Sequence, residues 1–150
     1  MSLSVKPEDV SIAELIPHAG SMVLLNEVLA FDPEAILCRA AVNPADNHPL
    51  ARNGRLPATA LAEYGAQAMA VHGGLLAEPG RPPRPGRLVA LGRLELAVAE
   101  LDQPAQLLVR ATRLGGDEAG QLYDFDIEAD GRQLASGRAT VMFADTGEGS

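Results

Sequence analysis

The sequence predicts an α+β domain in which one long helix lies against a curved antiparallel sheet. A proline-free, alanine-rich run, residues 58–77, spaces its apolar residues three and four positions apart, as a buried helix face does. Six further runs have the composition, length and flanking turn residues of strands. Because no second helical layer follows, the sheet must wrap around the helix.

Two strands are predicted before the long helix, over residues 22–31 and 35–42. The first is dense in valine and leucine and ends at an Asp-Pro-Glu turn, and the second alternates apolar and polar residues. A short helix over residues 10–16 is expected ahead of them, because Ser11 can cap a helix start with Glu14 three residues later. The chain should therefore open with a short helix followed by a two-stranded hairpin.

Two loops and four strands complete the chain. Residues 43–57 are rich in Asn, Asp, Pro and Gly, which predicts a long loop of the kind that often carries function. Residues 78–87 hold a run of Pro, Gly and Arg that predicts a stiff linker or flap. Strands are expected over 88–99, 106–114, 121–129 and 133–144, with Asp130-Gly131 as a hairpin turn and a disordered tail after residue 145.

This order of elements predicts a single hotdog domain over residues 1–150, with its core at about residues 11–144. A curved antiparallel sheet around one long central helix defines that fold. The sheet would leave open edges in a monomer, and pairing of two copies removes them. We therefore expect a homodimer or a larger homo-oligomer.

Charge and composition exclude several classes of function. The chain has 12 Lys and Arg against 20 Asp and Glu, so its net charge of −8 argues against nucleic-acid binding. Cys38 is the single cysteine and the three histidines are scattered, so we expect no metal and no cofactor. No apolar stretch approaches the roughly 20 residues that span a membrane, and the first residues do not form a signal peptide. A cytoplasmic protein is expected.

His48 and Glu63 are the candidate reacting groups. Reaction beside a thioester needs a base for the α-proton, an acid for the leaving β-hydroxyl and a donor for the carbonyl. His48 lies in the long loop and could be the base, whereas Glu63 lies in an apolar stretch where burial would favour its acid form. The amides of Ala58 and Thr59, at the helix start, could hold the thioester oxygen.

These residues stand in motifs that resemble a known family. Leu15-Ile-Pro-His18 followed by Met22-Val-Leu-Leu-Asn-Glu-Val28 is similar to the opening of the β-hydroxyacyl-(acyl carrier protein) dehydratases of the hotdog superfamily. Leu56-Pro57-Ala58 and Glu63-Tyr-Gly-Ala-Gln67 resemble their helix-start motif, with six positions from Pro57 to Glu63. The run from Glu63 to Gly73 is most similar to the ApeP-like branch, which is associated with aryl polyene clusters.

The resemblance implies a role for each site residue. It makes His48 the base and Glu63 the acid that assists at the β-hydroxyl, with the Ala58 amide on the thioester carbonyl. It also implies a composite site, in which His48 of one subunit faces Glu63 of the other. Gln67 lies one turn after Glu63 and could orient its carboxyl or make an ordinary polar contact. The implied substrate is a 3-hydroxyacyl thioester on an acyl carrier protein or its phosphopantetheine arm.

Three departures from the family pattern keep other functions open. His48-Pro-Leu-Ala51 replaces the usual His-Phe-Pro-Gly, the interval from His48 to Glu63 is one residue longer, and Ala58 replaces a glycine. One alternative is a hotdog thioesterase, in which Glu63 activates water. The other is a non-catalytic acyl-binding subunit that supports a second hotdog dehydratase in a heteromer.

The remaining candidates have structural interpretations beside functional ones. His18 is expected to support the substrate tunnel, His72 to pack or meet solvent, and Cys38 to be a buried, inert thiol. The chain also carries loop arginines that could either meet an acidic carrier protein or be solvated: Arg52, Arg55, Arg81, Arg84 and Arg87.

Overall fold

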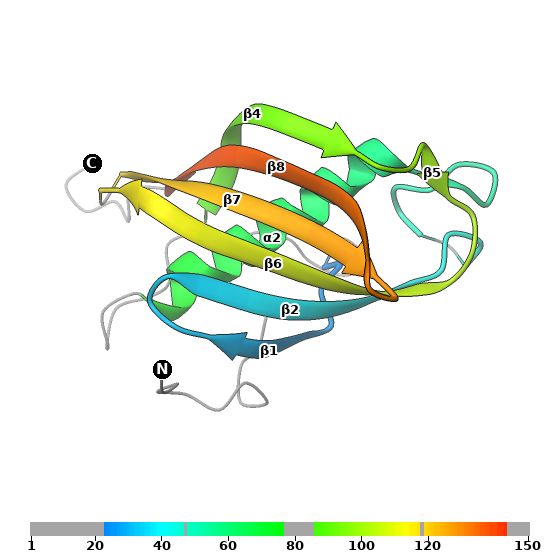
Figure 1. Cartoon of the computed structure of the whole chain (residues 1–150), viewed down its shortest axis with the longest axis horizontal. Coiled ribbons are helices and arrows are strands. Elements are labelled where there is room, and N and C mark those ends of the chain that lie inside the picture. Colours follow the sequence, from blue (N-terminus) through cyan, green and yellow to red (C-terminus); the bar gives the residue numbers. More distant parts are fainter. Residues whose placement is uncertain (1–22, 47, 77–85, 118, 144–150) are drawn as a thin grey trace.

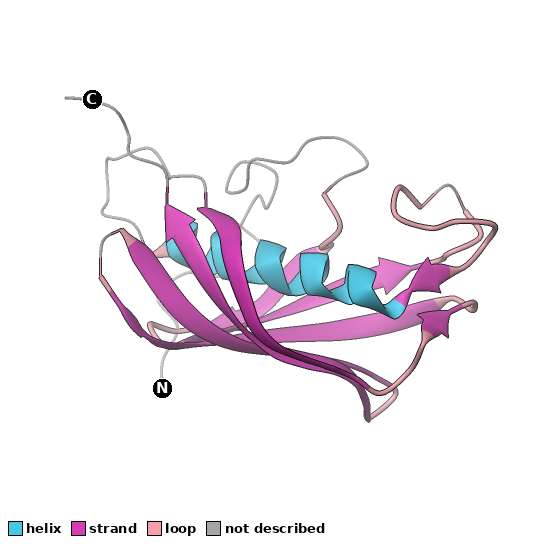
Figure 2. Cartoon of the chain, turned by 90° about the horizontal axis from the view of Figure 1, so that it is seen from above, coloured by secondary structure: helices cyan, strands magenta, loops and turns pink. Residues whose placement is uncertain are grey.

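The structure is a computed structural model that describes residues 23–46, 48–76, 86–117 and 119–143. A six-stranded antiparallel sheet in the order β1-β2-β6-β7-β8-β4 curves around helix α2 (Figures 1 and 2). The elements are β1 (Glu27–Phe31), β2 (Ala35–Val42), β3 (Leu56–Pro57), the 3-10 turn η3 (Ala58–Ala60), α2 (Leu61–Leu75), β4 (Gly86–Leu96), β5 (Glu100–Leu101), β6 (Ala105–Gly116), β7 (Gly120–Ala129) and β8 (Arg132–Phe143). The predicted α+β arrangement is confirmed.

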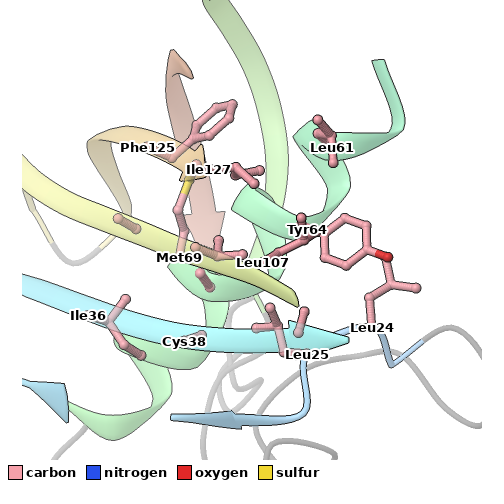
Figure 3. Close-up of a cluster of buried hydrophobic side chains, with 14 of the residues drawn as sticks. Leu24, Leu25, Ile36, Cys38, Leu61, Tyr64, Met69, Leu107, Phe125 and Ile127 are labelled. Atoms are coloured by element: carbon pink, nitrogen blue, oxygen red, sulfur yellow. The ribbon is translucent and has the colours of Figure 1, made fainter. Parts of the chain in front are cut away.

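The core lies between α2 and the concave face of the sheet. Alternation along the strands places one set of side chains inside, as in β2, where Ile36, Cys38, Ala40 and Val42 are buried. The same holds for Leu107, Val109 and Ala111 of β6 and for Tyr123, Phe125 and Ile127 of β7. Figure 3 shows part of this cluster between the strands and the helix. Burial of these apolar side chains holds the helix in the curve of the sheet.

Close approach of α2 to the sheet depends on two glycines. A Cβ built on Gly65 would lie 2.7 Å from Cδ2 of Phe125, and one built on Gly137 of β8 would lie 2.8 Å from Cε1 of the same ring. The Phe125 ring therefore occupies a slot between helix and strand that only glycines leave open. Gly65 therefore permits close packing of α2 against the sheet.

Two further predictions concern turns and strand ends. Asp130 and Gly131 have φ values of 54° and 74°, as a two-residue hairpin turn between β7 and β8 requires. The strand expected over 88–99 is β4, which begins at Gly86 and ends at Leu96. A further short strand, β5, follows it and pairs with β3, which lies in the segment 43–57 expected to be a loop. The expected N-terminal helix, the tail and most of the linker expected over 78–87 lie outside the described residues, while residues 86 and 87 of that linker belong to β4.

The helix begins differently from the prediction. Residues 58–60 form a 3-10 turn, and the α-helix runs over Leu61–Leu75 rather than over 58–77. Apart from the half-buried Leu75, the expected apolar face is buried, and Gln67 and His72 are buried with it. Within the described ranges, no helix has the length and apolar character needed to cross a membrane.

Candidate active site

A hollow of about 740 Å³ opens where β2 ends and β6 begins. Its wall is formed by the residues before β1, the end of β2, the loop that follows, α2 and the start of β6. Leu24, Val42, His48, Pro49, Tyr64 and Ala105 are among the residues that line it, and we call it the His48 hollow. The long loop predicted to carry function thus brings His48 to a concave surface beside the helix.

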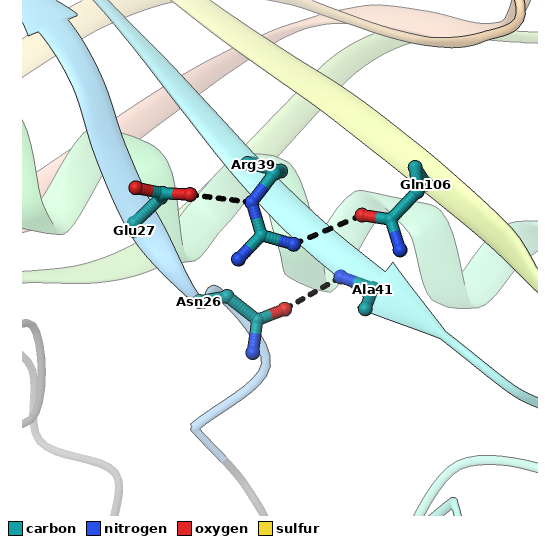
Figure 4. Close-up of polar contacts among 5 residues, drawn as sticks. All are labelled: Asn26, Glu27, Arg39, Ala41 and Gln106. Atoms are coloured by element: carbon teal, nitrogen blue, oxygen red, sulfur yellow. Dashed lines mark hydrogen bonds and ion pairs between the residues drawn. The ribbon is translucent and has the colours of Figure 1, made fainter.

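Polar contacts fix the strands at the rim of the His48 hollow (Figure 4). The Asn26 side chain accepts a hydrogen bond from the Ala41 amide at 2.5 Å. The Arg39 guanidinium donates to Glu27 at 2.5 Å and to Gln106 at 2.9 Å, which links β1, β2 and β6. The frame that carries the hollow is therefore tied across three strands.

The His48 ring has a partner at each nitrogen. Its Nδ1 accepts a hydrogen bond from the Leu50 amide at 3.0 Å, and its Nε2 lies 2.7 Å from Oη of Tyr64. Because Nδ1 accepts, the proton of the neutral ring resides on Nε2, which donates to the Tyr64 hydroxyl. His48 is half-buried, and this desolvation lowers its pKa, which favours the neutral ring.

Tyr64 is the residue of this site that the sequence prediction missed. It projects from α2, is 1% exposed, and its hydroxyl lies on the Leu24 side of the buried cluster (Figure 3). Burial raises the pKa of Tyr64, so the phenol stays protonated at neutral pH. The sequence offered one signal for Tyr64: an aromatic residue with a hydroxyl group stands directly after Glu63. At helical spacing, such a residue is indistinguishable from an ordinary core residue.

Glu63 lies in the first turn of α2 and is half-buried. Consecutive residues of an α-helix point about 100° apart, so Glu63 faces a different side of the helix from Tyr64. Among the described residues, Glu63 does not line the His48 hollow. The contact that His48 makes in this hollow is with Tyr64, and a meeting of His48 with Glu63 across two subunits stays a prediction.

The expectation that the Ala58 amide is free to hold a carbonyl is wrong for this structure. Ala58 is buried, and its amide donates to the Ala99 carbonyl at 3.0 Å. The cause is the β3–β5 pairing, which brings the chain after β4 alongside the helix start. Thr59, the other residue proposed for this role, is exposed at the same helix start.

Gln67 is buried and connects the helix to the wall of the hollow. Its Oε1 accepts a hydrogen bond from the Leu24 amide at 2.9 Å, which ties α2 to the chain that enters β1. This hydrogen bond is an ordinary polar contact, one of the two roles expected for Gln67. A role in orienting Glu63 or in binding substrate stays a prediction.

His72 and Cys38 take structural places. His72 is buried, with Nδ1 2.7 Å from Oη of Tyr123 and Nε2 2.7 Å from the Asp32 carbonyl. Cys38 is fully buried, which confirms the predicted burial, and burial raises the pKa of its thiol to about 12. No cluster of His, Cys, Asp or Glu that could bind a metal is found in the part of the chain that the structure describes.

Of the loop arginines, two can be placed. Arg52 and Arg55 line a second hollow of about 490 Å³, and Arg55 forms an ion pair with Glu100 at 3.4 Å. Both arginines are exposed. Arg81, Arg84 and His18 lie outside the described residues, and so does the side chain of Arg87.

A family model for the ApeP dehydratases matches residues 10–148, almost the whole chain. The chain belongs to the ApeP-like dehydratase family. A comparison with curated proteins finds no match of significance. The ApeP-like chain is similar in structure to one chain of the dehydratase heterocomplex ApeI:P from Xenorhabdus doucetiae, with a TM-score of 0.82 and 23% identity over 91% of this chain and 93% of that one.

Hotdog thioesterases share the fold at lower similarity. A mutant thioesterase from Pseudomonas aeruginosa has a TM-score of 0.59 at 14% identity, over 79% of this chain and 80% of that one. A hypothetical thioesterase with coenzyme A from Streptococcus pneumoniae has a TM-score of 0.60 at 13% identity, over 79% and 84%. These matches confirm the hotdog fold, and the family assignment makes the function that of a dehydratase.

Proposed function

We propose that this ApeP-like protein removes water from 3-hydroxyacyl thioesters and leaves trans-2-enoyl thioesters. The acyl group is carried by an acyl carrier protein in fatty-acid or aryl-polyene-type biosynthesis in the cytoplasm. The observation that carries the proposal is a histidine whose Nδ1 accepts a hydrogen bond, in a 740 Å³ hollow of a chain whose family is one of dehydratases.

The reaction is assigned to His48 and Glu63. His48 takes the α-proton, the β-carbon–oxygen bond breaks, and the departing hydroxyl receives a proton from Glu63 and leaves as water. The electron pair of the α-carbon–hydrogen bond becomes the new double bond. The only lone pair of the neutral His48 ring is on Nδ1, so the Leu50 amide must give up its contact when substrate binds.

Carbonyl polarisation is assigned to the exposed helix start at Thr59. Amides in the first turn of a helix lack intrahelical partners and lie in the positive end of the helix dipole. Neither η3 nor α2 has a side-chain cap at its start. Two amides, those of Ala58 and Thr59, were candidates for this role. Because the Ala58 amide donates to the Ala99 carbonyl, the Thr59 amide is assigned as the donor.

The assembly is assigned to a homodimer or to a heteromer with a second hotdog dehydratase. In the described chain β4 lies at the edge of the six-stranded sheet and pairs on one side only, with β8. An open edge of this length invites pairing with another sheet. The similarity to one chain of a dehydratase heterocomplex supports the heteromer. In either assembly Glu63 of one subunit would meet His48 of the other.

The carrier protein is assigned to the face that bears Arg52 and Arg55. Both side chains are exposed beside the helix start, at the second hollow. Guanidinium groups suit the carboxylates of an acidic carrier and the phosphate of its prosthetic arm. Removing the positive charges of Arg52 and Arg55 should slow turnover of carrier-linked substrates more than turnover of short synthetic thioesters.

The test is mass spectrometry of 3-hydroxyacyl thioesters incubated with the tagged protein, purified from its native cells so that any natural partner remains bound. The expected result is loss of one water, reduced by roughly 10² or more in His48→Ala and in Glu63→Ala. Glu34→Ala, which alters an exposed carboxylate in the β1–β2 turn, serves as the control and should retain full activity. Release of free thiol would identify a thioesterase instead. Dehydration that survives both substitutions would make this chain a non-catalytic partner.

A further inference from the structure

We propose that Tyr64 is a positioning residue for His48, holding the imidazole so that Nδ1 is its basic nitrogen. This inference rests on the proposed dehydration. The Leu50 amide donates to Nδ1, so the neutral ring carries its proton on Nε2, and this proton is donated to the Tyr64 hydroxyl at 2.7 Å. A base oriented by a hydrogen bond at its far nitrogen is a recurring arrangement in catalysis.

The helix makes Tyr64 a rigid anchor for a residue on a loop. His48 comes from the long segment between β2 and β3, whereas Tyr64 lies in the second turn of α2 with 1% of its surface exposed. Its ring is packed in the core cluster, so the oxygen has little freedom to move (Figure 3). A base fixed to a buried helix keeps its place while the loop around it adjusts to substrate.

The contact also favours the proton transfer. When Nδ1 takes the α-proton, the ring becomes a cation, and its Nε2 hydrogen bond to the Tyr64 oxygen becomes charge-assisted and stronger. The protonated phenol cannot take that proton away, so the charge stays on the ring. Among the described residues, the other titratable groups that line the His48 hollow are Asp46 and Asp130, both exposed.

The chain supplies a matched control. Tyr123 also lies 2.7 Å from a histidine ring, that of His72, in the core away from the His48 hollow. There the hydrogen bond runs the other way: Nε2 of His72 donates to the Asp32 carbonyl, so Nδ1 accepts from the Tyr123 hydroxyl. Tyr64→Phe and Tyr123→Phe each remove one buried hydroxyl from a histidine and leave the aromatic ring in place. Any loss of activity that comes only from weakened packing should appear in both variants.

The experiment measures kcat, KM and the pH profile of dehydration for both variants. Tyr64→Phe should lower kcat by about tenfold or more and change KM little, while Tyr123→Phe stays within about twofold of the wild type. The acid limb of the Tyr64→Phe profile should move to lower pH, because the cationic ring has lost its acceptor. Equal activity in the two variants, or an unmoved acid limb, would overturn the positioning role.

A spectroscopic measurement separates this inference from the proposed function. In nitrogen-labelled protein the Nε2 proton of His48 should give a slowly exchanging resonance, assigned by its absence from His48→Ala. That resonance should disappear in Tyr64→Phe and persist in Tyr123→Phe. If the resonance shows this pattern but the protein has no dehydratase activity, the contact between Tyr64 and His48 is supported and the proposed dehydration is contradicted. A proton found on Nδ1 of the neutral ring overturns the positioning, whatever the activity.

Discussion

Replacing Gly65 with alanine should destabilise the protein although alanine is the better helix former. The Cβ would lie 2.7, 2.8 and 3.1 Å from Cδ2, Cγ and Cε2 of Phe125, where carbon atoms prefer about 3.5–4.0 Å. The ring also lies close to β8, since a Cβ built on Gly137 would be 2.8 Å from its Cε1 and Cζ. Relief must therefore come from movement of α2 away from the sheet.

The size of this effect follows from two opposed contributions. Overpacking of a core costs about 1–3 kcal/mol, and three close contacts on a trapped ring place Gly65→Ala near the upper value. The gain in helix propensity is about 1 kcal/mol, so the net loss in free energy of unfolding should be about 2 kcal/mol. In the double variant, Phe125→Leu should recover at least about 1 kcal/mol of that loss, because it removes the ring that the new Cβ contacts.

Urea unfolding at equilibrium measures all four corners of this double-mutant cycle. Gly115→Ala in β6 is the control, because no atom lies within 4 Å of its Cβ, and its effect should be small. If Gly65→Ala raised the free energy of unfolding, or if its effect were independent of Phe125, the helix would not depend on the glycine slot. The proposed close approach of α2 to β7 and β8 would then be incorrect.

Three further predictions concern buried groups and a turn. Burial lowers the pKa of His72 below the ordinary value of 6.5, so its contribution to stability is full above pH 6.5 and declines as the pH falls below that value. Urea midpoints across this range should therefore drop in the wild type, and the drop should be smaller in His72→Leu. Native Cys38 should resist iodoacetamide at pH 8 and react in urea, as mass spectrometry would show; rapid native alkylation would contradict its burial. Gly131→Ala should cost about 1–2 kcal/mol because its φ is 74°, and an unchanged thermal midpoint would speak against the turn.

Much of the fold could be predicted from local patterns. The alternation in β2 and the Asp130-Gly131 turn are properties of a few neighbouring residues, and both appear as expected. The β3–β5 pairing could not be predicted, because each strand has only two residues and forms through contact between distant segments. That missed pairing is also the reason why the Ala58 amide was taken to be free.

In the candidate site, too, some residues could be predicted from the sequence and others could not. His48 and Glu63 were identified by their chemistry and by motif resemblance, which need no three-dimensional information. Tyr64 was missed because its importance comes from the loop that folds back onto α2, and helical spacing alone places it among core residues. The ring tautomer of His48 depends on the Leu50 amide, a contact that only the folded loop creates.

The central claim, that His48 moves the α-proton of a thioester substrate, is tested most directly by running the reaction backwards in D2O. A trans-2-enoyl thioester incubated with the assembly purified through this chain should gain one deuteron on its α-carbon and one hydroxyl on its β-carbon. Mass spectrometry should show this product, with a rate lower by roughly 10² or more in His48→Ala. Deuterated product formed as fast by His48→Ala as by the wild type would contradict the account.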